Sequence, residues 1–169
     1  MTAYLVWLGV HYNTIGTLRG ISSVVGLLGT FAFHFSVRSQ GLATTGMWSI
    51  IFQFGWLSLC YVGLYVKSID LALWLLVIGV CASRIGLWVF DLTITQYMQQ
   101  LIPENIRGVI GGVQKSLNGF FDLTTFALAI IFSDPKDFHV LVATGYCSVG
   151  LAMMLYYFGV YNKRDTFKI

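Results

Sequence analysis

Charged residues are scarce in this sequence, and their scarcity excludes a soluble globular domain. Only 10% of the 169 residues are charged, ten as Lys or Arg and seven as Asp or Glu, whereas about a quarter of the residues in soluble domains are charged. Hydrophobic residues make up 57% of the chain, and its mean hydropathy is +0.76. So few polar side chains cannot cover the surface of a domain of this size in water. The composition therefore indicates a chain embedded mostly in lipid.

Catalytic and metal-binding patterns are also missing from the sequence. The three cysteines lie far apart in apolar segments, which fits neither a disulfide framework nor a zinc site. The three histidines lack a neighbouring carboxylate at the spacing of a ligand set or a general base. The longest basic run, Lys163-Arg164, is too short for nucleic-acid binding. We therefore expect no enzyme activity, no cofactor, no metal site and no nucleic-acid partner. The cysteines and histidines are Cys60, Cys81, Cys147, His11, His34 and His139.

Five segments are long and apolar enough to be expected to cross a bilayer. A hydrocarbon core of roughly 30 Å needs about 20 mostly apolar helical residues, and Ser39–Val66 and Val140–Asn162 carry no charge at all. Pro103 separates two further segments that do contain charges. The expected spans are 4–35, 42–66, 70–101, 106–132 and 138–161, all within one bundle over residues 1–162 that is followed by a short tail at 163–169. Because continuous apolar runs do not suit a β-barrel, the predicted fold is an all-α membrane protein with five transmembrane helices.

Basic residues in the connecting segments predict the orientation of these spans. Five of them fall on one side and two on the other, and the side richer in Lys and Arg is normally cytosolic. The C-terminal tail is therefore expected in the cytosol. With five spans, the amino end then lies outside the cell. One additional upstream helix would return it to the cytosol. The five residues are Arg38, Arg107, Lys163, Arg164 and Lys168, and the two are Lys67 and Lys136.

Glycine is frequent, at 18 positions, and some glycines recur at the spacing of helix-packing motifs. Gly16 with Gly20, and Gly108 with Gly112, are four residues apart and so lie on one helix face. We expect these pairs to permit close helix approach, which is a packing role and carries no functional information.

Four charged residues lie inside the expected spans, where an unpaired charge costs at least a few kcal/mol. Arg84 and Asp91 are seven residues apart, as are Lys115 and Asp122, so each pair occupies one helix face. When the rise per residue is counted from the Pro103 turn along each helix, opposite charges on the two helices lie at similar distances from the turn. The expected ion pairs are Arg84 with Asp122 and Asp91 with Lys115. Two interpretations remain open: the pairs lock two helices together, or they line a solute path or gate.

Two long motifs lie on these helices: SRIGLWVFDLTITQ, which begins at Ser83, and RGVIGGVQKSLN, which begins at Arg107. Both resemble the ferroportin family of iron exporters within the major facilitator superfamily. A weaker likeness extends from Tyr4 to Tyr161. The resemblance implies a fold of twelve helices in two lobes with alternating access between them. This chain is similar to the eighth to twelfth helices of that plan, the C-terminal lobe without its first helix, and Met1 is expected to begin a truncated isoform or an incomplete gene model.

The resemblance also implies roles for individual residues. Arg84, Asp91 and Arg107 match positions of a polar network at the central cavity and the cytosolic gate, and Asp122 matches an acidic position facing the same cavity. The candidate cavity and gate residues are Arg84, Asp91, Arg107, Gln114, Lys115 and Asp122. Thr125 stands where vertebrate members carry a metal-binding histidine. Their metal-binding cysteine, which also contributes to binding the hormone hepcidin, belongs to a seventh helix that this sequence lacks. No iron ligand of the family is therefore expected here.

Two functional hypotheses follow from the sequence. The first is ferrous iron export at the plasma membrane by a multi-pass transporter of which this is a partial chain, unable to transport alone. The second is a non-transporting membrane fragment that regulates a full-length transporter by associating with it. The expected partners are ferrous iron as the transported solute, the lipid bilayer, and a missing N-terminal lobe or a full-length partner.

Overall fold

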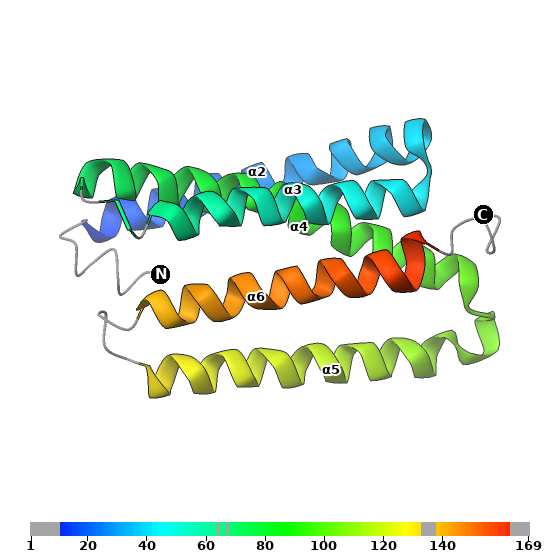
Figure 1. Cartoon of the computed structure of the whole chain (residues 1–169). Helices are drawn as coiled ribbons and strands as arrows, with labels where there is room; N and C mark the ends of the chain where they lie inside the picture. The colour runs from blue at the N-terminus through cyan, green and yellow to red at the C-terminus, as the bar shows by residue number, and fades with distance from the viewer. Residues whose placement is uncertain (1–10, 64, 67, 133–137, 163–169) are drawn as a thin grey trace.

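The structure is a computed structural model that describes residues 11–63, 65–66, 68–132 and 138–162. Its regular elements there are all helical (Figure 1), which confirms the predicted fold class. The elements are α2 (Tyr12–Gln40), α3 (Leu42–Gly63), α4 (Ile69–Leu101), α5 (Glu104–Ile131), α6 (Phe138–Tyr156) and the π-helical turn η2 (Tyr157–Tyr161).

The connections at one end of the bundle are set by one glycine and one proline. Gly41 alone separates α2 from α3, with a positive φ of 79° that L-residues with a Cβ rarely adopt. Its amide donates to the carbonyl of Val37 at 3.1 Å and so closes α2. Pro103 stands immediately before α5 and cannot continue α4 because it has no amide proton. The first helix runs to Gln40 and not to the expected residue 35, since only Gly41 stops it.

Helices α2, α3 and α4 form one tightly packed group, with α4 against both of the others. The contact between α3 and α4 depends on glycine, because a Cβ atom at Gly86 would lie 2.7 Å from the backbone oxygen of Ser49. The contact with α2 uses Trp88, whose side chain covers Gly26 and Gly29. Such close approach increases the dispersion contacts that hold helices together in lipid. The buried hydrophobic cluster of this group contains Phe33, Leu42, Val89 and Tyr97.

Helix α6 packs on α3 through aromatic side chains. Tyr146 stacks on Phe54 with ring centroids 4.5 Å apart, and its hydroxyl lies 3.1 Å from that of Ser58. Nearer the other end of α6, buried Tyr156 donates a hydrogen bond to the carbonyl of Ala43 at 3.2 Å and touches Gly46. These polar contacts fix the register of α6 against α3.

Helix α5 stands apart from this packed assembly. It runs alongside α6 in Figure 1, yet none of its 28 residues is buried. The Gly16–Gly20 and Gly108–Gly112 pairs, which were expected to permit close helix approach, meet no other described helix. No described atom lies within 4 Å of a Cβ built at any of the four glycines.

Among the described residues, three helical segments are long and apolar enough to cross a membrane. They are Gly20–Gln40, Trp74–Leu101 and His139–Tyr161. The uncharged α3 carries polar Thr45, Ser49 and Gln53, and α5 contains both acidic and basic residues. These polar residues lower the average hydropathy of the two helices. The five-span topology over residues 4–161 therefore stays a prediction.

Candidate functional site

Helix α4 has a packed face of small residues and an open polar face. The packed face meets α3 through Gly79, Gly86 and Thr93. The open face carries Arg84 and Asp91, which are exposed. Exposed Thr95 and Gln99 continue this stripe toward the end of the helix. The sequence therefore fixes which side of α4 is free, because the small residues commit the opposite side to α3.

Helix α5 carries a second polar face, and glycines interleave with its polar residues. Lys115 and Asp122 are exposed, and Gln114 is half-buried. The charged residues share this face with Asn118, because spacings of three, four and seven residues repeat along an α-helix. Its glycines, Gly108, Gly111, Gly112 and Gly119, have no described neighbour within 4 Å of a built Cβ. A helix face of this composition is suited to close contact with another helix or with water.

The predicted ion pairs are not formed in the structure. No salt bridge joins Arg84 to Asp122 or Asp91 to Lys115, although all four residues are described. Equal depth along the two helices is not sufficient for an ion pair. The helices must also be in contact, with their charged faces turned toward each other. Helix α5 does not pack on α4 beyond the turn at Pro103, so the charges stay apart.

Arg107 is the one candidate residue with a defined set of partners. Its Nη2 donates to the carbonyls of Gln99 at 2.8 Å and Ile102 at 3.1 Å, which are unsatisfied acceptors at the end of α4. The Arg107 Nε atom is buried and has no hydrogen-bond partner among the described residues. Arg107 therefore joins the two helices at their turn, and its buried Nε–H has no acceptor among the described residues.

The described part of the chain contains no cluster of side chains that could bind a metal ion. No three His, Cys, Asp or Glu residues there are placed to hold one ion. Thr125 directs its hydroxyl to the carbonyl of Phe121, one turn earlier, at 2.9 Å. Cys60 is buried beside the carbonyl of Leu76, with its sulfur 3.7 Å from the oxygen.

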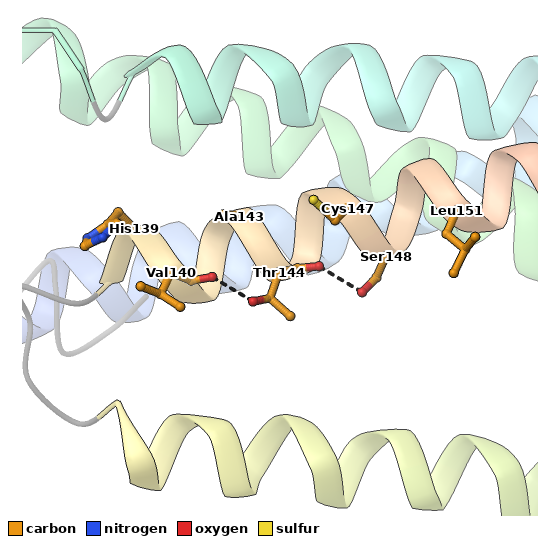
Figure 2. A pocket seen from close by; sticks show the side chains of 7 residues that line it. All are labelled: His139, Val140, Ala143, Thr144, Cys147, Ser148 and Leu151. Atoms are coloured by element: carbon orange, nitrogen blue, oxygen red, sulfur yellow. Dashed lines mark hydrogen bonds between the residues drawn. The ribbon is translucent and has the colours of Figure 1, made fainter.

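A groove of about 530 Å³ on α6 was not anticipated from the sequence. Figure 2 shows Thr144, Ser148 and Leu151 on the side of α6 that faces α5. The two hydroxyls bond to carbonyls of their own helix, at 2.8 Å each, so the groove surface is mainly apolar. Small residues four apart in an apolar segment could have indicated a helix-packing surface. The groove also contains exposed Cys147.

Apolar helices that carry uncovered polar faces indicate an integral membrane protein of the transporter class. The whole-sequence comparisons agree with this class. Residues 1–149 match the family described as Ferroportin1 (FPN1). The chain belongs to the ferroportin family, whose members are multi-pass membrane transporters and not enzymes.

Individual relatives support this membership. The chain is 42% identical to Solute carrier family 40 member 1 of Arabidopsis thaliana over 165 residues, 98% of this chain and 32% of the relative. It is 28% identical to Ferroportin of Homo sapiens over 211 residues, 92% of this chain and 37% of the relative. That alignment is longer than the 169-residue chain, so the human protein carries inserted residues. The chain thus spans about a third of the length of these relatives.

Two solved structures have the same arrangement of helices. One is an inward-facing bacterial homologue of the iron transporter ferroportin, with a TM-score of 0.86 and 27% identity over 90% of this chain and 38% of that one. The other is an outward-facing bacterial homologue with soaked iron, with a TM-score of 0.87 and 27% identity over 91% of this chain and 39% of that one. The described helices therefore have the arrangement found in a major facilitator-like transporter.

Proposed function

We propose that this chain supplies five helices of a ferroportin-type transporter that exports ferrous iron, and that it does not move the ion alone. The observation that supports this most directly is the pair of uncovered polar faces on α4 and α5. Charged side chains inside membrane spans are stable only against protein partners or water. Ion transport needs such a hydrated path, whereas a surface that faces lipid has no use for charged side chains.

Six residues are proposed to line this path or its gate. On α4, Arg84 and Asp91 share one exposed stripe, two turns apart. On α5, Lys115 and Asp122 are spaced in the same way, with Gln114 beside them. The two carboxylates would attract a cation, and the two basic residues would compete with it for them. Arg107 is proposed to hold the α4–α5 turn at the gate through its hydrogen bonds to the carbonyls of Gln99 and Ile102.

A complementary set of helices is part of this proposal. Helix α5 buries no residue, and α6 presents an empty apolar groove toward it. Five helices also do not enclose a path between two lobes. In each of these relatives, the part outside the match is about twice as long as the part that this chain covers. An N-terminal lobe, from the same gene or from a partner protein, would cover α5 and complete the path.

The open faces equally favour a second function, in which the chain regulates a full-length transporter by binding it. The glycine-rich side of α5 is suited to close helix–helix contact in lipid. In that case association occurs and iron transport does not. The two functions differ in one measurable property, the iron flux of the assembled complex.

The deciding experiment reconstitutes the full chain in liposomes that contain a ferrous-iron indicator, alone and with a co-expressed N-terminal lobe of the Arabidopsis relative. Transport by a shared path predicts no flux with the chain alone and flux with both parts. Asp91→Asn should remove most of that flux, because it removes a cation-attracting carboxylate. Thr17→Val is the matched control, since this hydroxyl bonds only within its own helix. Stable association without flux would favour the regulatory function.

We also propose a plasma-membrane location with the C-terminus in the cytosol. The excess of basic residues on the Arg38 side supports this orientation. A single cysteine at position 38 in a cysteine-free background should resist membrane-impermeant maleimide in intact cells and react after permeabilisation. Labelling from outside would reverse the orientation.

A further inference from the structure

A cavity of about 330 Å³ lies between α2 and α4, close to the end of α2. Its lining combines polar and apolar side chains. The polar ones are His34 and Arg38 on α2 and Gln96 on α4. Phe33 and Val37 supply the apolar part. None of the six candidate transport residues lines it.

The polar side chains of this cavity have free hydrogen-bonding capacity. No hydrogen bond or salt bridge to a described residue engages His34, Arg38 or Gln96, and both α2 side chains are exposed. Between them they offer a guanidinium fork, an amide NH₂ and a ring N–H, the last in either protonation state of histidine. Helix α2 contains no acidic residue that could neutralise Arg38. The cavity therefore holds several donors and the positive charge of Arg38, and its lining contains no acidic side chain.

The position of these donors along α2 selects the kind of ligand. Arg38 lies in the last turn of the helix, at the depth of the membrane interface if α2 spans the bilayer. His34 is one turn deeper, about 6 Å along the axis. Phe33 packs edge-on against His34 at 6.5 Å between ring centroids, and with Val37 it provides an apolar surface beside the donors. A ligand that fits both parts has an anionic head and an apolar body.

We propose that this cavity binds the phosphate of an anionic phospholipid, with Arg38 as the principal contact. Arginine matches phosphate geometry because its planar fork donates two parallel hydrogen bonds. Gln96 would donate to the same phosphate from α4, so a bound lipid bridges α2 and α4. A phosphate without acyl chains has the same donors but leaves the apolar surface unused. A zwitterionic headgroup brings its own cation near Arg38, which weakens the attraction.

The test uses the full 169-residue chain in detergent, titrated with phosphatidylglycerol or phosphatidylcholine and observed by native mass spectrometry. Phosphatidylglycerol should bind more tightly than phosphatidylcholine. Arg38→Gln should weaken phosphatidylglycerol binding about fivefold, the factor that corresponds to about 1 kcal/mol for one basic residue near a lipid surface. The affinity of Arg38→Lys for phosphatidylglycerol should lie between those of the unmodified chain and Arg38→Gln, because lysine keeps the charge and loses the planar fork. Millimolar inorganic phosphate should not displace the lipid.

Two further variants keep the test independent of folding and total charge. Gln96→Leu leaves every charge in place and should also weaken binding, by less than Arg38→Gln. His139→Gln changes a histidine at the start of α6, which lies at the opposite end of the bundle from the end of α2 (Figure 1), and should bind the lipid like the unmodified chain. Equal affinity for the two lipids, or for the Arg38→Gln and unmodified chains, would overturn the site. Full displacement of the lipid by inorganic phosphate would assign the cavity to free phosphate and overturn the proposal of a lipid ligand.

Discussion

Arg107 donates a 2.8 Å hydrogen bond from Nη2 to the main-chain carbonyl of Gln99, across the turn between α4 and α5. The same nitrogen reaches the carbonyl of Ile102 at 3.1 Å. The side chain of the first turn of α5 thus caps the last turn of α4. A basic residue is suited to this place, because the carbonyl end of a helix carries partial negative charge.

Replacing Arg107 should loosen this turn. Arg107→Gln is expected to cost about 1 kcal/mol of unfolding free energy, which is below the usual range for hydrogen bonds from a charged donor because the turn is partly exposed. The readout is unfolding in a denaturing-detergent titration, together with faster amide exchange over residues 99–107. Gln100→Ala, at an exposed position in the last turn of α4, is the control and should change neither measurement. Unchanged exchange in Arg107→Gln would show that the cap contributes nothing.

A second prediction compares two glycines with opposite surroundings. Gly86→Ala should destabilise the chain by about 1–3 kcal/mol, the usual cost of overpacking, because the added methyl would meet the Ser49 backbone oxygen at 2.7 Å. Gly112→Ala adds the same methyl where no described atom lies within 4 Å, and it should be neutral or slightly stabilising. Thermal unfolding in detergent measures both. If Gly112→Ala instead weakens association with an added N-terminal lobe, the α5 face is the contact surface.

A third prediction concerns the charges of α4 and α5. Because Arg84 and Asp122 form no ion pair, the effects of Arg84→Ala and Asp122→Ala on unfolding free energy should add to within about 0.5 kcal/mol in the chain alone. A double-mutant cycle provides this number. Coupling well above that limit would mean that α5 docks on α4 in detergent.

The fourth prediction is that the chain alone does not bind ferrous or cobaltous ion tightly. Tight binding of these ions needs several imidazole, thiolate or carboxylate groups converging on one point. The described residues bring no three such groups together. Calorimetric titration should show no stoichiometric site of micromolar affinity or better. A site that disappears in Asp122→Asn would locate ligands that this reasoning missed.

The sequence was sufficient to predict the elements whose causes are local. The proline at 103 predicted the break between α4 and α5, and the structure places it directly before α5. Uncharged length predicted α3 and α6. The end of α2 was placed at residue 35, five residues early, whereas the helix continues until Gly41 ends it.

Properties that depend on how helices face one another were not predictable from spacing. The predicted ion pairs required α4 and α5 to be in contact, and a count of residues along each axis carries no information on that. Glycine spacing is limited in the same way: Gly86, outside the two motifs, packs closely against α3, whereas Gly112, inside one of them, meets no other described helix. The π-helical turn Tyr157–Tyr161 had no counterpart in the pattern of apolar residues.

The packing of α2, α3 and α4 has a consequence for the synthesis of the chain in the cell. These helices follow one another in sequence and bury their contacts among themselves, so the group can assemble as soon as residue 101 has entered the membrane. Helix α5 leaves the ribosome next, carrying Lys115 and Asp122, and none of its residues is buried against the other described helices. We expect its insertion to be the slowest step of biogenesis, and the point at which an unassembled chain is recognised and degraded.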